Sequence, residues 1–309
     1  MAAVNSCWAA LEWLLWARRL SRPAPPLRAP VFVLGHPRTG TTHLQNLLAC
    51  DAARFATPST FDVGFPSFSL SGRALKPWLA GLVDSTRPMD ATALSLETPA
   101  EDEIAVQTLS GGCSSYMALV FPRLWRRFLP LARLDPRAGT AAPPGRAPPA
   151  YEAFGPADSG EVARWKLAFS AFLRKLQLRD DDAGVRRLLL KSPSHTGHVK
   201  TILELFPDAQ FVYIHRHPLD VFASAAHMAD AYTWFVNLQG MGDEDLTEFV
   251  IWQFKALHEA YVADRGLIPD GNLVEVSFAE LEERPLETLA RIYAALGWDN
   301  WADAEKAVE

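Results

Sequence analysis

The chain has 309 residues, of which 49% are hydrophobic and 21% are charged, and its formal net charge is −6. A chain of this length and composition can bury a sizeable core, which excludes general disorder and leaves room for one or two domains. The acidic balance argues against a nucleic-acid-binding protein, and we expect no nucleic-acid partner. Three widely separated cysteines form neither a metal-ligand pattern nor a disulfide framework, which favours a reducing compartment.

Residues 1–30 are predicted to form a helix and a Pro-rich lead-in. The stretch from Cys7 to Ala17 is apolar and rich in Trp, but Glu12 interrupts it. It is shorter than the roughly 20 apolar residues that span a bilayer, and it lacks the features of a signal peptide. We therefore expect an amphipathic helix packed on the domain, with peripheral membrane contact through residues 7–19 as the alternative. The predicted compartment is the cytoplasm, with membrane association or the Golgi as alternatives.

Short apolar runs alternate with helical patterns along the rest of the chain. The first run is VFVL at 31–34, followed by a Gly-containing turn and a helix from about Thr41. Further strands are predicted at 188–190, 211–214 and 273–276, with helices after Val199, after Pro218 and from Pro285 to Leu296. This alternation predicts an α/β fold with a central parallel sheet and helices on both faces.

Residues 31–309 are expected to form a single domain. A Pro-, Ala- and Gly-rich segment at about 135–160 is predicted to be a flexible surface insertion. We interpret it as an insertion because predicted sheet strands lie on both sides of it.

The sequence GHPRTGTT at 35–42 stands directly between the first predicted strand and its helix. Gly35 and Gly40 permit backbone conformations that turn amide N–H groups inward, and the helix N-terminus adds partial positive charge. Thr41 and Thr42 add hydroxyl donors. Together these features predict a binding site for a doubly charged, phosphate-like group.

The loop differs from that of a nucleotide triphosphatase, which reads GxxxxGK[ST]. Thr41 stands where the lysine belongs, and the cation of the loop is Arg38 instead. The best candidate for an Mg²⁺-binding strand ends in Lys191 rather than in an aspartate. Both differences argue against hydrolysis of ATP or GTP. A P-loop kinase is nevertheless the second hypothesis, and a catalytically inactive nucleotide-binding module is the third.

The run Arg38-Thr39-Gly40-Thr41-Thr42 resembles the [KR][ST]GTT loop of the sulfotransferases that use 3′-phosphoadenosine 5′-phosphosulfate (PAPS). A second signature of that family is an Arg after a strand and a Ser eight positions later, which grip the 3′-phosphate. Arg216 and Ser224 match it. Lys191, in the sequence LKSP, is similar to a strand-end lysine of the tyrosylprotein branch, and the arginine form of the loop is similar to that branch and to the bacterial-type branch.

The resemblance covers 31–224, with a weaker tail at 276–298, and it implies a P-loop-like sulfotransferase fold. It also implies PAPS as co-substrate, no metal ion, and a C-terminal segment that is abbreviated here. The implied donor contacts are Pro37, Arg38, Thr39, Gly40, Thr41, Thr42, Arg216 and Ser224.

Sulfuryl transfer is an in-line displacement in which charge moves onto the leaving oxygen, so electrostatic stabilisation dominates. We expect Arg38 and Lys191 to neutralise that oxygen. A hydroxyl acceptor also needs a general base, and the best candidates are Asp102 and Glu103, with His195 as the alternative. Glu101 is instead assigned to a helix-capping box with Thr98.

No motif identifies the acceptor. A small molecule, a glycan, a lipid and a peptide all stay open.

Overall fold

The computed structural model describes residues 2–22, 27–82, 86, 93–135, 154–179, 186–233 and 236–308. These residues form one sheet of five parallel strands in the order β2-β3-β1-β4-β5. The strands are β1 (Val31–Leu34), β2 (Phe55–Ala56), β3 (Arg187–Lys191), β4 (Gln210–His215) and β5 (Leu273–Ser277). The strand that precedes the phosphate loop, β1, therefore lies in the middle of the sheet.

Helices connect the strands and cover the sheet. In chain order they include α1 (Ala2–Leu20), α2 (Thr41–Ala49), α3 (Thr60–Gly64), α4 (Lys76–Leu79), α5 (Asp102–Leu109), α6 (Met117–Val120), α7 (Trp125–Phe128), α8 (Ser159–Arg179), α9 (Val199–Leu205), α10 (Pro218–Met228), α12 (Asp243–Asp264), α13 (Phe278–Glu283), α14 (Pro285–Ala295) and α15 (Trp301–Val308). Two short 3₁₀ helices, η1 (Ser71–Leu75) and η5 (Pro193–Gly197), also contribute contacts discussed below.

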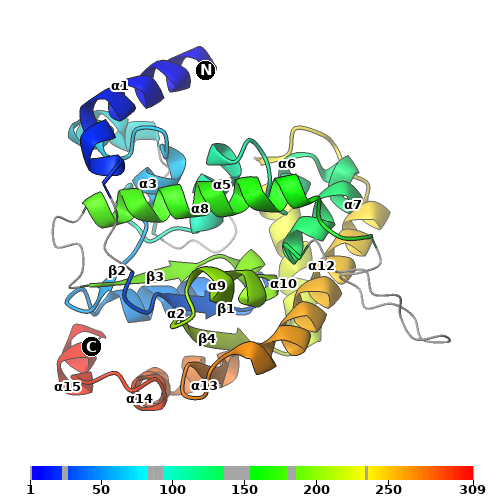
Figure 1. Ribbon diagram of the computed structural model, residues 1–309. Helices are drawn as coiled ribbons and strands as arrows, with labels where there is room; N and C mark the ends of the chain where they lie inside the picture. The colour runs from blue at the N-terminus through cyan, green and yellow to red at the C-terminus, as the bar shows by residue number, and fades with distance from the viewer. Residues whose placement is uncertain are drawn as a thin grey trace.

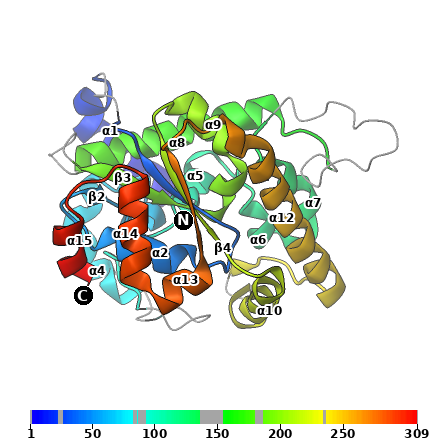
Figure 2. The same cartoon turned by 90° about the horizontal axis from the view of Figure 1, so that it is seen from below.

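Successive side chains of a strand point to opposite faces of its sheet, and β1 therefore contributes to two cores. Val33 packs with Leu44 of α2 and Leu289 of α14, whereas Phe32 packs with Phe169 of α8. Figure 1 shows α8 on one side of the sheet and α13, α14 and α15 on the other. Figure 2, seen from below, shows α2 and α14 across the second face. The predicted parallel sheet with helices on both faces is confirmed.

The four predicted strands are present as β1, β3, β4 and β5, each within two residues of its predicted bounds. We did not predict β2, because two residues carry no periodic pattern. The long helices α8 and α12 and the final helix α15 were also not predicted. Of the predicted insertion at about 135–160, residues 136–153 lie outside the described residues, and α8 begins at Ser159.

The N-terminal segment is helical, and one side of it packs on the domain. Glu12, the residue that interrupts the apolar stretch, is 1% exposed. Its carboxylate accepts hydrogen bonds from the backbone N–H of Leu70 at 2.8 Å and pairs with the ammonium of Lys175 at 2.6 Å. Trp8 adds a ring contact with Phe68. In the described parts of the chain, no helix has both the length and the apolar character needed to cross a membrane.

Candidate functional site

The phosphate loop leaves the carboxyl end of β1 in a conformation that requires glycine. Gly40 has a φ of 94°, and a Cβ there would lie 2.3 Å from the ring of Phe278. A Cβ at Gly35 would lie 2.6 Å from the carbonyl oxygen of Ile214 on β4. Arg38 also has a positive φ, of 74°, which is uncommon for a residue with a side chain. The loop is thus tightly packed between β1, β4 and the start of α13.

Hydrogen bonds hold both ends of the loop. The Gly35 N–H donates to the Thr196 hydroxyl at 2.8 Å, and that hydroxyl donates to the Gly35 carbonyl at 3.1 Å. The Thr39 hydroxyl donates to the carbonyl of His36 at 2.8 Å. Burial lowers the pKa of the His36 imidazole to about 4, so this ring is neutral at pH 7. Arg38 therefore supplies the formal charge of the loop.

The structure brings the two predicted phosphate signatures together. The Arg38 Nε donates to the Ser224 hydroxyl at 3.0 Å, although the two residues are 186 positions apart. A guanidinium nitrogen of Arg216 lies 3.5 Å from the Arg38 carbonyl oxygen, and its guanidinium carbon stacks 4.6 Å from the centre of the Phe278 ring. The remaining predicted donor contacts, Pro37, Thr39, Gly40, Thr41 and Thr42, form the loop itself and the first turn of α2.

Lys191 is the last residue of β3, the strand beside β1, and it is 2% exposed. Its ammonium donates to the hydroxyl of Thr42 at 3.1 Å and to the Glu101 carboxylate at 2.7 Å. The other oxygen of Glu101 accepts a hydrogen bond from the Tyr116 hydroxyl at 2.6 Å. Glu101 is therefore the carboxylate that reaches the phosphate loop, through Lys191.

The predicted capping box between Thr98 and Glu101 is wrong. Helix α5 begins at Asp102 with Glu101 as its N-cap, and the Glu101 side chain makes no capping hydrogen bond. The reason is a short antiparallel bridge between Pro99 and Ser59, which keeps the residues before the helix extended. The Thr98 hydroxyl instead accepts a hydrogen bond from the Ser95 N–H, so the Glu101 side chain is free of the capping role.

Asp102, one of the predicted bases, is fully buried, and its carboxylate is bonded to the end of β3 and to His195. One of its oxygens accepts a hydrogen bond from the Lys191 backbone N–H at 3.1 Å, and the other lies 2.5 Å from Nε2 of His195. In return, the Ser192 hydroxyl accepts the backbone N–H of Glu103 at 3.0 Å. These reciprocal bonds join the first turn of α5 to the end of β3, and they fix Glu101 next to Lys191.

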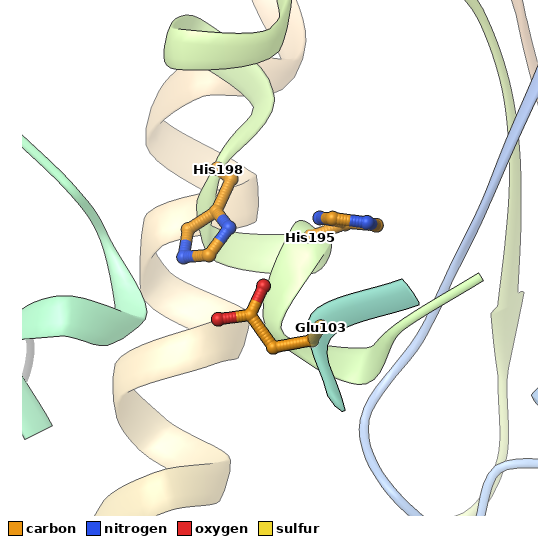
Figure 3. A group of neighbouring side chains, drawn as sticks. All are labelled: Glu103, His195 and His198. Atoms are coloured by element: carbon orange, nitrogen blue, oxygen red, sulfur yellow. The ribbon is translucent and has the colours of Figure 1, made fainter. Parts of the chain in front are cut away.

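Glu103 and His195, the other two predicted bases, lie with His198 in a second buried cluster (Figure 3). The Glu103 carboxylate accepts hydrogen bonds from the Ser114 hydroxyl at 2.5 Å and from the Trp165 ring N–H at 3.1 Å. Burial raises the pKa of Glu103 to about 7 and lowers that of His198 to about 3. Burial also opposes protonation of His195, but the neighbouring carboxylates of Asp102 and Glu103 raise its pKa above the ordinary value.

Two imidazoles and one carboxylate are ligands that bind Zn²⁺ in proteins. In this cluster their ligand atoms lie within 4.8 Å of one another. Nδ1 of His195 and Nδ1 of His198 have no hydrogen-bond partner within the described ranges. The geometry is thus compatible with a metal ion but does not require one.

A parallel sheet with a glycine-containing loop after its central strand, and an Arg and Ser pair after the neighbouring strand β4, defines a P-loop-like α/β fold. The chain belongs to the Sulfotransferase family, whose model matches residues 30–303.

Its relatives include omega-hydroxy-beta-dihydromenaquinone-9 sulfotransferase Stf3 of Mycobacterium tuberculosis and of Mycobacterium bovis. The chain is 28% identical to each over 302 residues, which cover 96% of this chain and 70% of the relative. The fold is similar to that of sulfotransferase STF1 from Mycobacterium tuberculosis, with a TM-score of 0.68 and 19% identity over 97% of this chain and 75% of that one. STF9 from Mycobacterium avium gives a TM-score of 0.64 and 18% identity over 97% and 71%. The predicted resemblance to bacterial-type sulfotransferases, and the predicted fold, are confirmed.

Sequence reasoning missed three residues of the site: Glu101, Tyr116 and Phe278. Glu101 was named but assigned to the capping box, since three acids in a row can be told apart only once the start of the helix is known. Tyr116 and Phe278 carry no local signal, because each reaches the site from a segment distant in the chain.

Proposed function

We propose that this protein transfers the sulfuryl group of PAPS to an acceptor hydroxyl by in-line displacement, without a metal ion. The observation that carries the proposal is the 3.0 Å contact between Arg38 and Ser224. It puts the loop and the second phosphate signature in one site, which fits a nucleotide with charged groups on both its 5′ and 3′ oxygens. In this assignment the loop amides, Thr41 and Thr42 hold the 5′-phosphosulfate, and Arg216 and Ser224 hold the 3′-phosphate.

Lys191 and Arg38 are proposed to neutralise the oxygen that leaves sulfur. Lys191 already donates to Thr42 of the loop, so its ammonium lies beside the expected phosphosulfate. It is almost fully buried, and a charge in a site with little water acts more strongly than the same charge in solvent. Losing one such donor typically costs about 10²–10³ in rate.

We propose Glu101 as the general base, and Asp102, Glu103 and His195 as residues that position it. Glu101 keeps 23% of its side chain exposed, whereas the other three are fully buried and bonded within the core. Its carboxylate takes the proton of the acceptor hydroxyl while the acceptor oxygen bonds to sulfur. The bond between sulfur and the bridging phosphate oxygen breaks, which leaves a sulfate ester and 3′,5′-adenosine bisphosphate.

Among the acceptor classes left open by the sequence, we propose a lipid-like compound with a hydroxyl group. The name of the relative Stf3 indicates that it acts on a hydroxylated menaquinone derivative. The cytoplasm stays the predicted compartment.

Thermal denaturation with 3′,5′-adenosine bisphosphate, ADP, AMP and ATP–Mg²⁺ tests the donor site. A ligand at about 100 times its dissociation constant adds about 2.7 kcal/mol of stability. We expect only the bisphosphate to raise the midpoint. Stabilisation by ATP–Mg²⁺ instead would contradict the proposal.

Transfer of labelled sulfate from PAPS to a long-chain primary alcohol or a hydroxylated quinone, measured with and without chelator, then tests turnover. Bisphosphate binding without transfer to any hydroxyl compound would favour the inactive nucleotide-binding module.

A further inference from the structure

Helix α1 presents a broad apolar surface to solvent beyond the strip of Trp8 and Glu12 that packs on the domain. Between Ser6 and Ala17 the only charged residue is Glu12, and its side chain is buried against the domain. Four large apolar side chains of this helix are exposed: Leu11 (41%), Trp13 (65%), Leu14 (72%) and Leu15 (63%). We call these four the outer face of α1. Single exposed apolar residues are ordinary on a protein surface, but four within five positions form a contiguous patch that needs a partner.

The orientation of the outer face is set by the buried contacts of Glu12. Besides the Leu70 N–H, one carboxylate oxygen accepts hydrogen bonds from the N–H and the hydroxyl of Ser71, at 3.0 and 3.1 Å. The other oxygen pairs with Lys175 on α8. Because Glu12 is held from two elements, rotation of the helix to bury Trp13 and Leu14 would break an ion pair that is almost closed to water. The patch is therefore a fixed feature of the surface.

We propose that the outer face of α1 docks the protein on the surface of a lipid bilayer that contains anionic lipids. Charge supports this partner: the helix ends in Arg18 and Arg19, and Arg22 follows, all three exposed. Leu and Trp side chains beside a basic cluster are the composition of helices that lie in the membrane interface. A second copy of the chain fits less well, since a stable protein interface uses about 20–30 residues on each side and the outer face has four.

The location of α1 agrees with such a surface. Figure 1 shows α1 on the same side of the sheet as α5 and α6. Glu101 is the N-cap of α5, and its partner Tyr116 directly precedes α6. A bilayer along α1 therefore lies on the side of the sheet that carries the proposed base, where a lipid-like acceptor would be supplied. Docking itself is separate from the transfer reaction and can be tested without it.

The test is co-sedimentation of the protein with vesicles of phosphatidylcholine, with or without phosphatidylglycerol. We expect the protein to sediment with the mixed vesicles. High salt should release it, because salt screens the attraction between the arginines and the anionic lipids. Leu14→Glu should weaken the partition about tenfold or more, because it removes one large apolar contact and adds a like charge to the anionic surface. Leu167→Glu is the matched control, since Leu167 is 73% exposed on α8; it should partition as the wild type does.

Thermal unfolding with 3′,5′-adenosine bisphosphate shows whether each variant is folded and separates this proposal from the donor site. A Leu14→Glu variant with a normal bisphosphate shift and lost vesicle binding supports the proposal. Wild-type protein that stays in the supernatant with both kinds of vesicle would overturn it, and so would equal losses in Leu14→Glu and Leu167→Glu. A dimer that Leu14→Glu dissociates, with no vesicle binding, would assign the outer face to a second copy instead.

Discussion

Replacing Glu101 by Gln tests the proposed base with the smallest change of shape. The amide keeps the size of the side chain: its oxygen can accept from Lys191 and its NH2 can donate to the Tyr116 hydroxyl, but it cannot take a proton at neutral pH. General-base catalysis contributes about 10²–10⁴ in rate, so kcat should fall by that factor. The bond to Tyr116, at 2.6 Å, and part of the bond to Lys191 should survive. We therefore expect a loss of stability of only about 1–3 kcal/mol.

The assay is release of 3′,5′-adenosine bisphosphate from PAPS in the presence of a hydroxyl acceptor, with the pH dependence of kcat as a second readout. The wild type should lose activity as the pH falls and Glu101 becomes protonated, whereas the Gln variant should lack this acidic limb. The thermal shift caused by the bisphosphate should be unchanged, because Glu101 is not among the proposed donor contacts.

Glu97→Gln is the matched control. Glu97 lies four residues upstream, pairs with Lys76 at 2.5 Å and is 69% exposed, so its replacement removes an ion pair without touching the loop. If Glu101→Gln turned over as fast as Glu97→Gln and kept the acidic limb, Glu101 could not be the base. Asp102, Glu103 and His195 would then have to be reconsidered in spite of their burial.

Three further predictions concern the donor site, the buried cluster and the anchor of α1. Arg216→Ala should abolish the midpoint shift caused by 3′,5′-adenosine bisphosphate, measured by thermal denaturation, because it removes the forked cation proposed for the 3′-phosphate. Glu103 binds its proton more tightly in the folded state, with a pKa of about 7 against 4.5. The free energy of unfolding of the wild type, measured by denaturant titration, should therefore fall by about 3 kcal/mol relative to that of Glu103→Gln as the pH rises from 4.5 to 7. Glu12→Ala should cost about 3–5 kcal/mol in the same titrations, because Lys175 is left without its carboxylate in a partly closed site.

Each of these has its own control. Arg284→Ala, at an arginine with 60% side-chain exposure that pairs with Glu287, should leave the bisphosphate shift intact. A constant stability difference between wild type and Glu103→Gln from pH 4.5 to 7 would show that Glu103 does not carry the extra proton. Glu204→Ala breaks a surface pair with Lys166 and should cost no more than about 1 kcal/mol. If Glu12→Ala lost no more stability than Glu204→Ala, α1 would be held by its apolar contacts alone.

Much of the fold follows from short-range patterns in the chain. Buried parallel strands are continuous apolar runs, so VFVL and FVYI were found within two residues of β1 and β4. The helices that were missed have less regular patterns: α12 buries only scattered positions along 22 residues. Its apolar side chains are divided between the sheet and a separate cluster around Trp125, and this division cannot be recognised before the fold is known.

The residues proposed for the donor side could be named from the sequence in the same way, because the loop at 35–42 and the pair Arg216 and Ser224 each lie in one short stretch. The acceptor side was not. Which of three consecutive acids faces Lys191 depends on where α5 begins, and that point is set by the bridge between Ser59 and Pro99. A contact between residues 40 positions apart leaves no trace in the local sequence, and the capping-box rule, applied locally, selected the wrong start.

The strand order has a consequence for how this protein is made. β1 pairs with β3 and β4, and β2 pairs with β3, so no two strands of the sheet can join before residue 187 has been synthesised. The ribosome thus releases well over half of the chain before the first sheet contact exists, and the apolar strand VFVL must wait unpaired during that time. We expect nascent chains that stop short of β3 to be targets for chaperones and proteases. Since Arg216, proposed to hold the 3′-phosphate, follows β4, we expect nucleotide binding only in chains that have closed the middle of the sheet.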